Sequence, residues 1–343
     1  MAKQYDINTI FQELCGEHSA GFLAKKLNVN VGTVNRWKSQ GRVPKNYIFD
    51  LLKIAGIDID YSMFTYKDKD QFFTPEKIAK YYINKTCDVL NQFVNVDEYS
   101  FIEPSAGNGA FFNSLPSPKI GMDIETDNPE IETKDFLDYT PPEGKYITIG
   151  NPPFGLRGQK ALQFILHAFE FSDFVAFILP PLFDSDGRGT PKKRVGQHLI
   201  FSEKVFSNEF YYPNDTVTRI NCIFQIWSKE DFGVDLNEFF EPHGYKVYSL
   251  SDGGTPATTR NKDKLYKCDY YLPSTVFGKN NMKLYPSFED LPQRRGYGII
   301  LEDKTVGEKI EKIDWGEVGF RSTNNAVNLR TSIIVKAIET GQD

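Results

Sequence analysis

Strands alternate with helices along residues 73–227, and no other feature of this 343-residue chain limits its fold so strongly. Apolar runs at 145–150 and 173–179 have the length and composition of buried strands, while 76–94 and 158–171 show the apolar spacing of helices. Such alternation is typical of a parallel sheet with helices on both faces. We therefore predict an α/β fold for this part, with further strands at 99–103 and 119–123, a short helix around 111, and a terminal antiparallel hairpin made of 205–211 and 220–227.

The first 66 residues follow a different pattern, which is helical and basic. Seven Lys or Arg residues lie within 25–53, against one acidic residue, Asp50. Ser19 is placed to cap a helix that turns Phe22 and the apolar residues after it onto one face. We predict a separate basic module here.

The second helix of this module, predicted at 31–40, would bury Val31, Val34 and Trp37 and end at Gly41. The stretch LAKKLNVNVGTVNRWKSQGRVP resembles the helix-turn-helix of phage repressors, in which the second helix lies in the DNA major groove. A small helical bundle with a solvated basic face is the alternative. The resemblance implies DNA contacts from the polar face of this helix, at Thr33, Asn35, Arg36 and Lys38.

Beyond residue 229 the alternation of strands and helices ends. This segment is rich in Gly, Tyr, Asn, Lys and Arg, and it finishes in an apolar, helix-like stretch at 333–338. We predict three domains: a helix-turn-helix domain (1–66), an α/β domain (67–229) that starts with the polar linker 67–71, and a mixed α+β domain (230–343) that would recognise the target.

The turn after the strand at 99–103 reads EPSAGNGAF. Gly107 and Gly109 would let a ligand approach the backbone, and a helix after them would offer unpaired amide donors. Asp123, at the end of the next strand, is placed to accept hydrogen bonds from ribose hydroxyls. Two glycines between a strand and a helix are also a common tight connection, so this turn alone does not establish a nucleotide site.

Four residues, Asn151, Pro152, Pro153 and Phe154, directly follow the strand at 145–150. They stand at the carboxyl end of a predicted parallel strand, where open α/β sheets bind ligands. Because the prolines fix the backbone, the Asn151 side-chain oxygen and the Pro152 carbonyl could both accept hydrogen bonds from one amino group.

This NPPF motif is preceded in the chain by FFTPEKIA, FIEPSAGNGAF, GMDIE and KDF. With these motifs in this order, residues 71–227 resemble the amino-group DNA methyltransferases that use S-adenosylmethionine. The resemblance implies a Rossmann-like methyltransferase domain with the gamma order of motifs. It implies contacts to the amino acid end of S-adenosyl-L-methionine at Phe73, Thr74, Pro75, Glu103, Ser105 and Gly107, to the ribose at Asp123, and to the adenine at Asp135 and Phe136.

Asn at the first position of NPPF is commonest in family members that modify adenine N6. The resemblance therefore implies a site-specific adenine methyltransferase acting on double-stranded DNA, with Asn151, Pro152, Pro153 and Phe154 as its catalytic set. Because N6 is inaccessible within a duplex, the adenine would be flipped out and stacked on Phe154, which stands where many relatives have Tyr.

Other functions remain open. Methylation of cytosine N4, of RNA or of protein glutamine is one alternative, because a similar strand end occurs in enzymes for those substrates. A DNA-binding regulator that only senses S-adenosylmethionine is another, although Asn151 and Phe154 argue against it. A homodimer and a cognate restriction nuclease are open as partners.

A basic cluster after the strand at 173–179 is a further candidate for DNA contact, since cations there could clamp phosphates. A solvated surface loop is the alternative. The cluster consists of Arg188, Lys192, Lys193 and Arg194.

Composition excludes several classes of protein. Four separated cysteines and four histidines without ligand spacing predict neither disulfides nor a metal site. No apolar run has the length of a membrane span, and the first residues lack an apolar signal block, so we expect a cytoplasmic protein without a membrane partner. The net charge of -6 argues against a protein that coats nucleic acid unspecifically.

Overall fold

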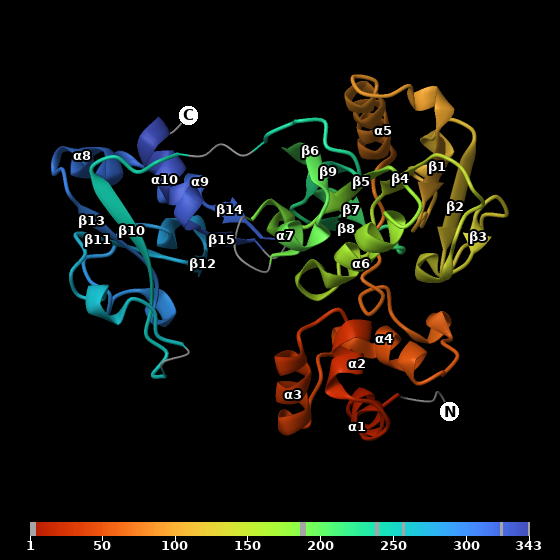
Figure 1. Cartoon of the computed structure of the whole chain (residues 1–343), viewed down its shortest axis with the longest axis horizontal. Helices are drawn as coiled ribbons and strands as arrows, with labels where there is room; N and C mark the ends of the chain where they lie inside the picture. Colours follow the sequence, from red (N-terminus) through yellow and green to blue (C-terminus); the bar gives the residue numbers. More distant parts are fainter. Residues whose placement is uncertain (1–4, 186–189, 237–239, 256–257, 323–324, 342–343) are drawn as a thin grey trace. The chain divides into compact units, whose positions relative to one another are not determined.

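The computed structural model describes residues 5–185, 190–236, 240–255, 258–322 and 325–341 (Figure 1). Its contacts divide the chain into two compact units. The first comprises Met1–Leu179, Glu209–Thr218 and Phe224–Asp231, and the second comprises Pro180–Asn208, Arg219–Ile223 and Phe232–Asp343. No helix in the described ranges is long and apolar enough to cross a membrane.

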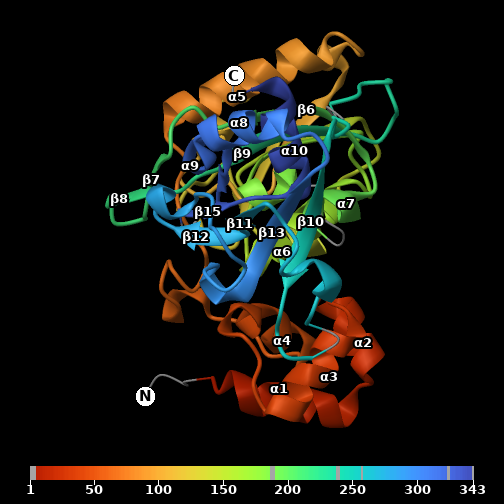
Figure 2. The ribbon, with the colours of Figure 1, turned by 90° about the vertical axis from the view of Figure 1, so that its left-hand side faces the viewer.

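The described part of the amino-terminal module, residues 5–66, contains four α-helices, and they gather in one bundle in both views (Figures 1 and 2). Ser19 accepts a hydrogen bond from the Phe22 amide at 3.2 Å, so it caps the second helix as predicted. Val31 is 45% exposed, however, and the prediction that it is buried is wrong; Phe22, at the start of the apolar face of α2, is 40% exposed. Val31 is the first residue of its helix and lies outside the bundle core, which is built around Phe11, Leu23, Val34, Trp37 and Leu51. The helices are α1 (Ile7–Glu17), α2 (Ala20–Lys26), α3 (Val31–Gln40) and α4 (Ile48–Ile54).

The main sheet of the first unit runs in the order β3-β2-β1-β4-β5-β9, which is the strand order of a Rossmann-like fold. The pairs β1–β2, β1–β4, β4–β5 and β2–β3 are parallel, so their carboxyl ends share one edge. The predicted α/β class is therefore confirmed. The strands are β1 (Ser100–Glu103), β2 (Lys119–Asp123), β3 (Glu132–Thr133), β4 (Tyr146–Gly150), β5 (Phe174–Leu179) and β9 (Ile223–Ser228).

Helices α5 (Glu76–Leu90) and α6 (Gln159–Ala168) pack on the strands of this sheet. From α5, Tyr82 is fully buried and its ring stacks on Phe224 of β9 at 4.1 Å between centroids. Helix α6 buries Leu162 and Ile165, and it contacts β5. Aromatic and aliphatic stripes on the two helices thus cover apolar strands that would otherwise be exposed to water.

The structure corrects two local predictions. No α-helix follows the glycine turn: Phe112–Ser114 forms a single 3-10 turn, so the predicted helix amino terminus with its amide donors does not exist. The predicted hairpin between 205–211 and 220–227 is also wrong, because β7 (Glu209–Tyr211) pairs with β8 (Val217–Arg219). Asp215 adopts a positive φ of 60°, and its amide donates to the Tyr212 carbonyl, which forms a tight turn between β7 and β8. The pattern of apolar residues does not indicate this turn.

The second unit is a mixed α+β structure, as expected for the carboxyl-terminal part. One sheet has the order β10-β13-β11 and another has the order β12-β15-β14. Its core contains Leu272, Ile299, Val327 and Ile334. The elements are α7 (Pro191–Val195), β6 (His198–Lys204), β10 (Tyr245–Ser251), β11 (Tyr270–Pro273), β12 (Thr275–Phe277), β13 (Arg295–Leu301), α8 (Thr305–Lys312), α9 (Trp315–Val318), β14 (Phe320–Arg321), β15 (Ala326–Asn328) and α10 (Thr331–Thr340).

Candidate functional site

The order of the sheet reverses between β1 and β4, and this point marks the candidate site. The two strands are parallel, so the residues that follow them emerge side by side. Ser105, after β1, donates a hydrogen bond from Oγ to the main-chain carbonyl of Asn151, after β4, at 3.1 Å. In open α/β sheets the crevice at such a reversal is where ligands bind.

A pocket at this edge collects residues from segments far apart in the sequence. Its empty volume is about 600 Å³, including the open solvent at its mouth. Of the predicted residues, Thr74, Pro75, Glu103 and Phe154 do not line it. Those that do are Phe73, Ser105, Gly107, Asp123, Asp135, Phe136, Asn151, Pro152 and Pro153. We call this the cofactor pocket, after the cofactor contacts that the sequence resemblance predicts for these residues.

The Asn151 side chain is hydrogen-bonded to Thr74. Its Nδ2 donates to Thr74 Oγ1 at 3.1 Å, and the Thr74 side chain is buried. The Asn151 Oδ1 atom is buried too, and within the described part of the chain no donor reaches it. A buried oxygen without a donor is costly, and a ligand with an N–H group would remove that cost.

The local sequence predicts that Thr74 caps the helix that follows, and the structure shows otherwise. Helix α5 has Pro75 at its N-cap and no side-chain capping bond. The Thr74 hydroxyl is used by Asn151 instead. The helix also ends at Leu90, short of the predicted Val94.

Asp123 lies at the end of β2, as predicted, with its carboxylate facing the glycine turn. Its Oδ2 accepts from the Gly107 amide at 2.8 Å and its Oδ1 accepts from the Glu125 amide at 3.1 Å. Burial raises the pKa of this carboxyl, while these backbone hydrogen bonds oppose the rise. Each oxygen keeps a lone pair, so two hydroxyl donors could still be bound.

Gly107 is required by both its conformation and its neighbour. Its φ of +53° lies in the left-handed region, and a Cβ there would stand 3.0 Å from Cδ1 of Phe73. A side chain at this position would therefore collide with the aromatic wall of the cofactor pocket.

Glu103 is buried at the end of β1, with 2% of its surface exposed. Burial raises the pKa of this carboxyl well above 4.5, and the Phe112 amide opposes the rise. Within the described residues no donor reaches its Oε2. The carboxyl is therefore a buried acceptor close to the reversal point, although it does not line the cofactor pocket.

Phe154 packs inside the protein. Its ring is 5% exposed and meets Phe72 edge to face at 5.2 Å between centroids. Its carbonyl accepts from the Lys160 amide at 3.1 Å, which ties the NPPF corner to the start of α6. Stacking of a base on this ring remains a prediction.

Asp135 and Phe136 also line the cofactor pocket. Asp135 Oδ1 accepts from the Leu137 amide at 2.9 Å, and its Oδ2 lies 3.3 Å from Lys53 Nζ of α4. Phe136 is 1% exposed and packs against Phe164 at 5.2 Å between centroids. The amino-terminal module thus contacts a residue of the cofactor pocket directly.

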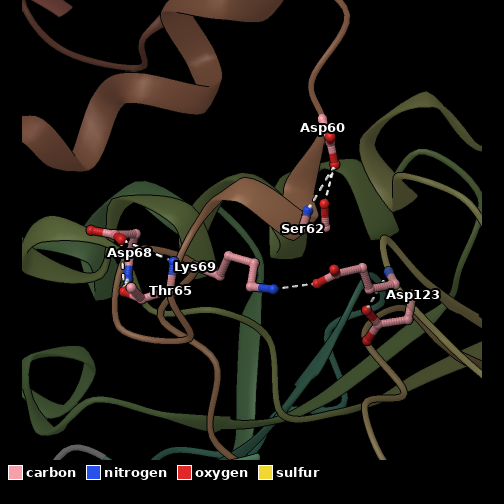
Figure 3. A network of polar contacts seen from close by, with 7 residues as sticks. Asp60, Ser62, Thr65, Asp68, Lys69 and Asp123 are labelled. Atoms are coloured by element: carbon pink, nitrogen blue, oxygen red, sulfur yellow. Dashed lines mark hydrogen bonds and ion pairs between the residues drawn. The ribbon is translucent and has the colours of Figure 1, made fainter. Parts of the chain in front are cut away.

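Two site residues, Lys69 and Asp70, escape prediction because 67–71 has the composition of a polar linker. The Lys69 side chain is 9% exposed and forms an ion pair with Glu125, next to Asp123 (Figure 3). Asp70 Oδ2 accepts from the Gly155 amide at 2.8 Å, and burial raises the pKa of its carboxyl. The alternating charges of KDKDQ are the only signal in the sequence, and a solvated segment carries the same signal.

The predicted DNA-contact residues occupy two places. On α3, Asn35, Arg36 and Lys38 are exposed, whereas Thr33 is half-buried with its Oγ1 3.1 Å from Asn30 Oδ1. In the second unit the predicted basic loop contains a short helix, α7. That helix carries Lys192, Lys193 and Arg194, while Arg188 lies outside the described residues.

Comparison with known proteins gives distant similarities, and no family model matches the chain. Protein ENHANCED DOWNY MILDEW 2 of Arabidopsis thaliana is 29% identical over 131 residues, which cover 34% of this chain and only 10% of that protein. Among solved structures, the 23S rRNA methyltransferase ErmE is 14% identical with a TM-score of 0.32, covering 49% of this chain and 73% of its own. The methyltransferase subunit of a type I restriction-modification system from Streptococcus thermophilus is 14% identical with a TM-score of 0.35, covering 65% of each chain.

Proposed function

We propose that this chain is an S-adenosylmethionine-dependent methyltransferase that modifies the N6 amino group of adenine in double-stranded DNA. The observation that carries the proposal is the Asn151 side-chain oxygen, which is buried beside a pocket at the reversal point of the sheet and receives no hydrogen bond from the residues that the structure describes. An exocyclic amino group is the donor that this oxygen lacks.

The cofactor pocket fits the proposed cofactor in two respects. Asp123 keeps acceptor capacity for a pair of ribose hydroxyls. Gly107 lines the pocket without a side chain, so a ligand would meet only its backbone there. When bound, S-adenosylmethionine supplies a methyl group on a positively charged sulfur, which needs no further activation.

The residues of the NPPF corner would orient the target nitrogen. Asn151 Oδ1 and the Pro152 carbonyl would each accept one hydrogen bond from the amino group, which fixes the direction of the nitrogen lone pair. Thr74 anchors the Asn151 amide, because its hydroxyl accepts a hydrogen bond from Nδ2. Stacking on Phe154 would require its face to be uncovered, since Phe72 packs against it in the structure.

DNA binding by α3 is part of the same proposal. Asn35, Arg36 and Lys38 are exposed on one helix whose other face is held in the module core by Val34 and Trp37. Exposed basic and amide side chains on a rigid helix are suited to phosphates and base edges.

The decisive experiment identifies the modified base. Unmethylated plasmid DNA is incubated with the full chain and S-adenosylmethionine, digested to nucleosides and analysed by mass spectrometry, with RNA and a glutamine-containing peptide in parallel. We expect N6-methyladenine from DNA alone. N4-methylcytosine, methylated RNA or methylated glutamine would replace the adenine assignment by the corresponding alternative.

Variants connect the product to the site. Asn151→Ala should abolish methylation and leave cofactor binding largely intact, because the acceptor belongs to the target nitrogen. Asn214→Ala is the matched control, since Asn214 lies exposed in the turn before β8. Full activity of Asn151→Ala would refute the proposed role.

A further inference from the structure

Three alternate residues before α5 contact the NPPF corner, residues 151–154. Thr74 binds the side chain of the first residue of the corner, and the ring of Phe72 packs against that of the last. Asp70 binds the residue that follows the corner: its Oδ2 accepts from the Gly155 amide at 2.8 Å. The corner is thus contacted at both of its ends by one short stretch of chain. Of these three contacts, that of Asp70 has no part in the function proposed above.

The Asp70 contact fixes a peptide plane at the end of the corner. The Gly155 N–H and the Phe154 carbonyl belong to the same peptide unit. The N–H donates to Asp70, and the carbonyl accepts from the Lys160 and Ala161 amides at the start of α6, at 3.1 and 3.3 Å. Because these two groups point to opposite sides of a trans peptide, the plane cannot rotate without breaking hydrogen bonds. Asp70 and α6 therefore set the direction in which the chain leaves Phe154.

Gly155 is a point at which the corner would otherwise be free to turn. Its φ of +66° lies in the left-handed region, and a Cβ there would stand 2.7 Å from the Lys160 Cβ. The close approach of α6 thus requires glycine, the residue with the widest choice of backbone conformations. The amide that Asp70 binds is that of the most flexible residue type, so the hydrogen bond replaces rigidity that a side chain cannot supply here.

The conformation of Asp70 itself is unusual for a linker residue. Its φ of 52° is one that few residues other than glycine adopt, although Asp and Asn tolerate it. Burial raises the pKa of its carboxyl, while the Gly155 and Phe154 amides oppose the rise. A left-handed backbone and a carboxylate withdrawn from water both cost free energy, and such costs persist where the arrangement serves a function.

The segment that carries Asp70 is fixed by further contacts. The Phe73 amide donates to the Tyr211 carbonyl of β7 at 2.6 Å, and the Tyr211 amide donates back to the Phe73 carbonyl at 3.0 Å. Lys69 forms its ion pair with Glu125. A residue can hold another in place only when it is held itself, and Asp70 meets this condition on both sides.

We propose that Asp70 is a positioning residue for methyl transfer, whose carboxylate binds the Gly155 amide and so keeps the main chain of the NPPF corner in the geometry that receives the target nitrogen. The inference rests on the proposed function, which makes this corner the acceptor of the target amino group. In this role Asp70 acts on the main chain of the corner, whereas Thr74 acts on the side chain of Asn151.

Three variants isolate the carboxylate. Asp70→Gly removes it, and glycine adopts the positive φ of this position without strain. Asp70→Asn keeps an oxygen acceptor for the amide and tolerates the same φ. Asp215→Gly is the matched control, because Asp215 has a φ of 60° and is exposed in the turn between β7 and β8.

The first measurement needs no substrate. The full chain is labelled with ¹³C at the phenylalanine carbonyls and ¹⁵N at glycine, so that NMR selects glycines that follow phenylalanine, among them Gly155 and the exposed Gly278. In wild type the Gly155 amide should exchange with water at least about tenfold more slowly than that of Gly278. Asp70→Gly should abolish this protection.

The second measurement is methyl transfer to plasmid DNA, expressed per molecule able to bind S-adenosylmethionine in calorimetry. Asp70→Gly should lower kcat about 10- to 100-fold and leave the KM for DNA nearly unchanged, because a displaced corner misdirects the bound nitrogen. Asp70→Asn should be at least about threefold faster than Asp70→Gly. A residue that only stabilised the fold would lower the melting temperature and the number of active molecules, with kcat per active molecule unchanged.

The outcomes separate this inference from the proposed function. A Gly155 amide that stays protected in Asp70→Gly overturns the inference, as does wild-type kcat in that variant, an equal loss in Asp215→Gly, or an Asp70→Asn rate no higher than that of Asp70→Gly. If wild type methylates nothing, the proposed function fails, while loss of protection in Asp70→Gly would still show that Asp70 holds the corner. If Asp70→Gly does not fold, wild type and Asp70→Asn decide: protection of Gly155 in both supports the inference, and exchange as fast as that of Gly278 overturns it.

Discussion

Replacing Thr74 by Val tests how the site orients Asn151. Valine has nearly the same shape as threonine but lacks the oxygen that accepts from Asn151 Nδ2 at 3.1 Å. Because Thr74 is only 5% exposed, water cannot easily take the place of the hydroxyl. Leaving a buried donor without a partner costs about 1–3 kcal/mol, so the orientation that places Nδ2 against residue 74 loses this much of its advantage.

A turned amide would present Nδ2 where the target amino group needs an acceptor. The preference for the productive orientation then falls by the same free energy, so kcat should fall about 5- to 150-fold. The affinity for S-adenosylmethionine should change little, because the cofactor pocket is not lined by Thr74. Thr74→Ser, which keeps the oxygen, should recover most of the rate.

The assay is single-turnover methyl transfer to plasmid DNA, with calorimetry of cofactor binding alongside. Loss of cofactor affinity in Thr74→Val with kcat unchanged would support the alternative that the family resemblance implies, in which Thr74 holds the methionine end. Wild-type rates in Thr74→Val would refute the orienting role altogether.

Three further predictions concern the glycine turn, the buried carboxyl and α3. Gly107→Ala should lower the free energy of unfolding by about 1–2 kcal/mol, measured by urea titration, and should weaken cofactor binding, measured by calorimetry. Gly56→Ala is the control, because Gly56 has a similar φ but no atom within 4 Å of the position that a Cβ would take, and it should lower stability alone. The pKa of Glu103 is higher in the folded than in the unfolded chain, so the contribution of its protonated form to stability falls as the pH rises above 4.5. The melting temperature of Glu103→Gln should therefore decrease less steeply with pH than that of the wild type. Parallel plots of melting temperature against pH would contradict this. Arg36→Ala should reduce the slope of log affinity against log salt concentration for DNA binding, measured by fluorescence anisotropy, by the amount that corresponds to about one phosphate contact. An unchanged slope would argue against α3 as the DNA-contacting helix.

The parts of the site on strand ends could be predicted from the sequence. The fully buried strands β4 and β5 are marked by continuous apolar runs. Residues that follow parallel strands meet at one edge, so the sequence alone places Ser105, Asp123 and Asn151 near each other. Local patterns suffice here because the strand itself determines where the next residue points.

Residues whose partners are distant in the sequence could not be assigned in this way. A threonine before proline and glutamate has the local chemistry of a helix cap, and only the approach of Asn151 shows its other use. Lys69 and Asp70 look like solvated linker residues until Glu125 and the Gly155 amide are brought to them. The hairpin of β7 and β8 could not be predicted because a turn at Asp215 interrupts a pattern that periodicity alone extends.

The short segment between the helical bundle and the sheet has consequences for engineering this chain. Two neighbouring residues in it, Lys69 and Asp70, are anchored to different loops, at Glu125 and Gly155. One extra residue inserted between them would displace one anchor by about 3.5 Å, more than a hydrogen bond can span. Chimeras that exchange the amino-terminal module should therefore be joined upstream of Lys67, since a flexible glycine-serine spacer across 67–71 would release both anchors at once.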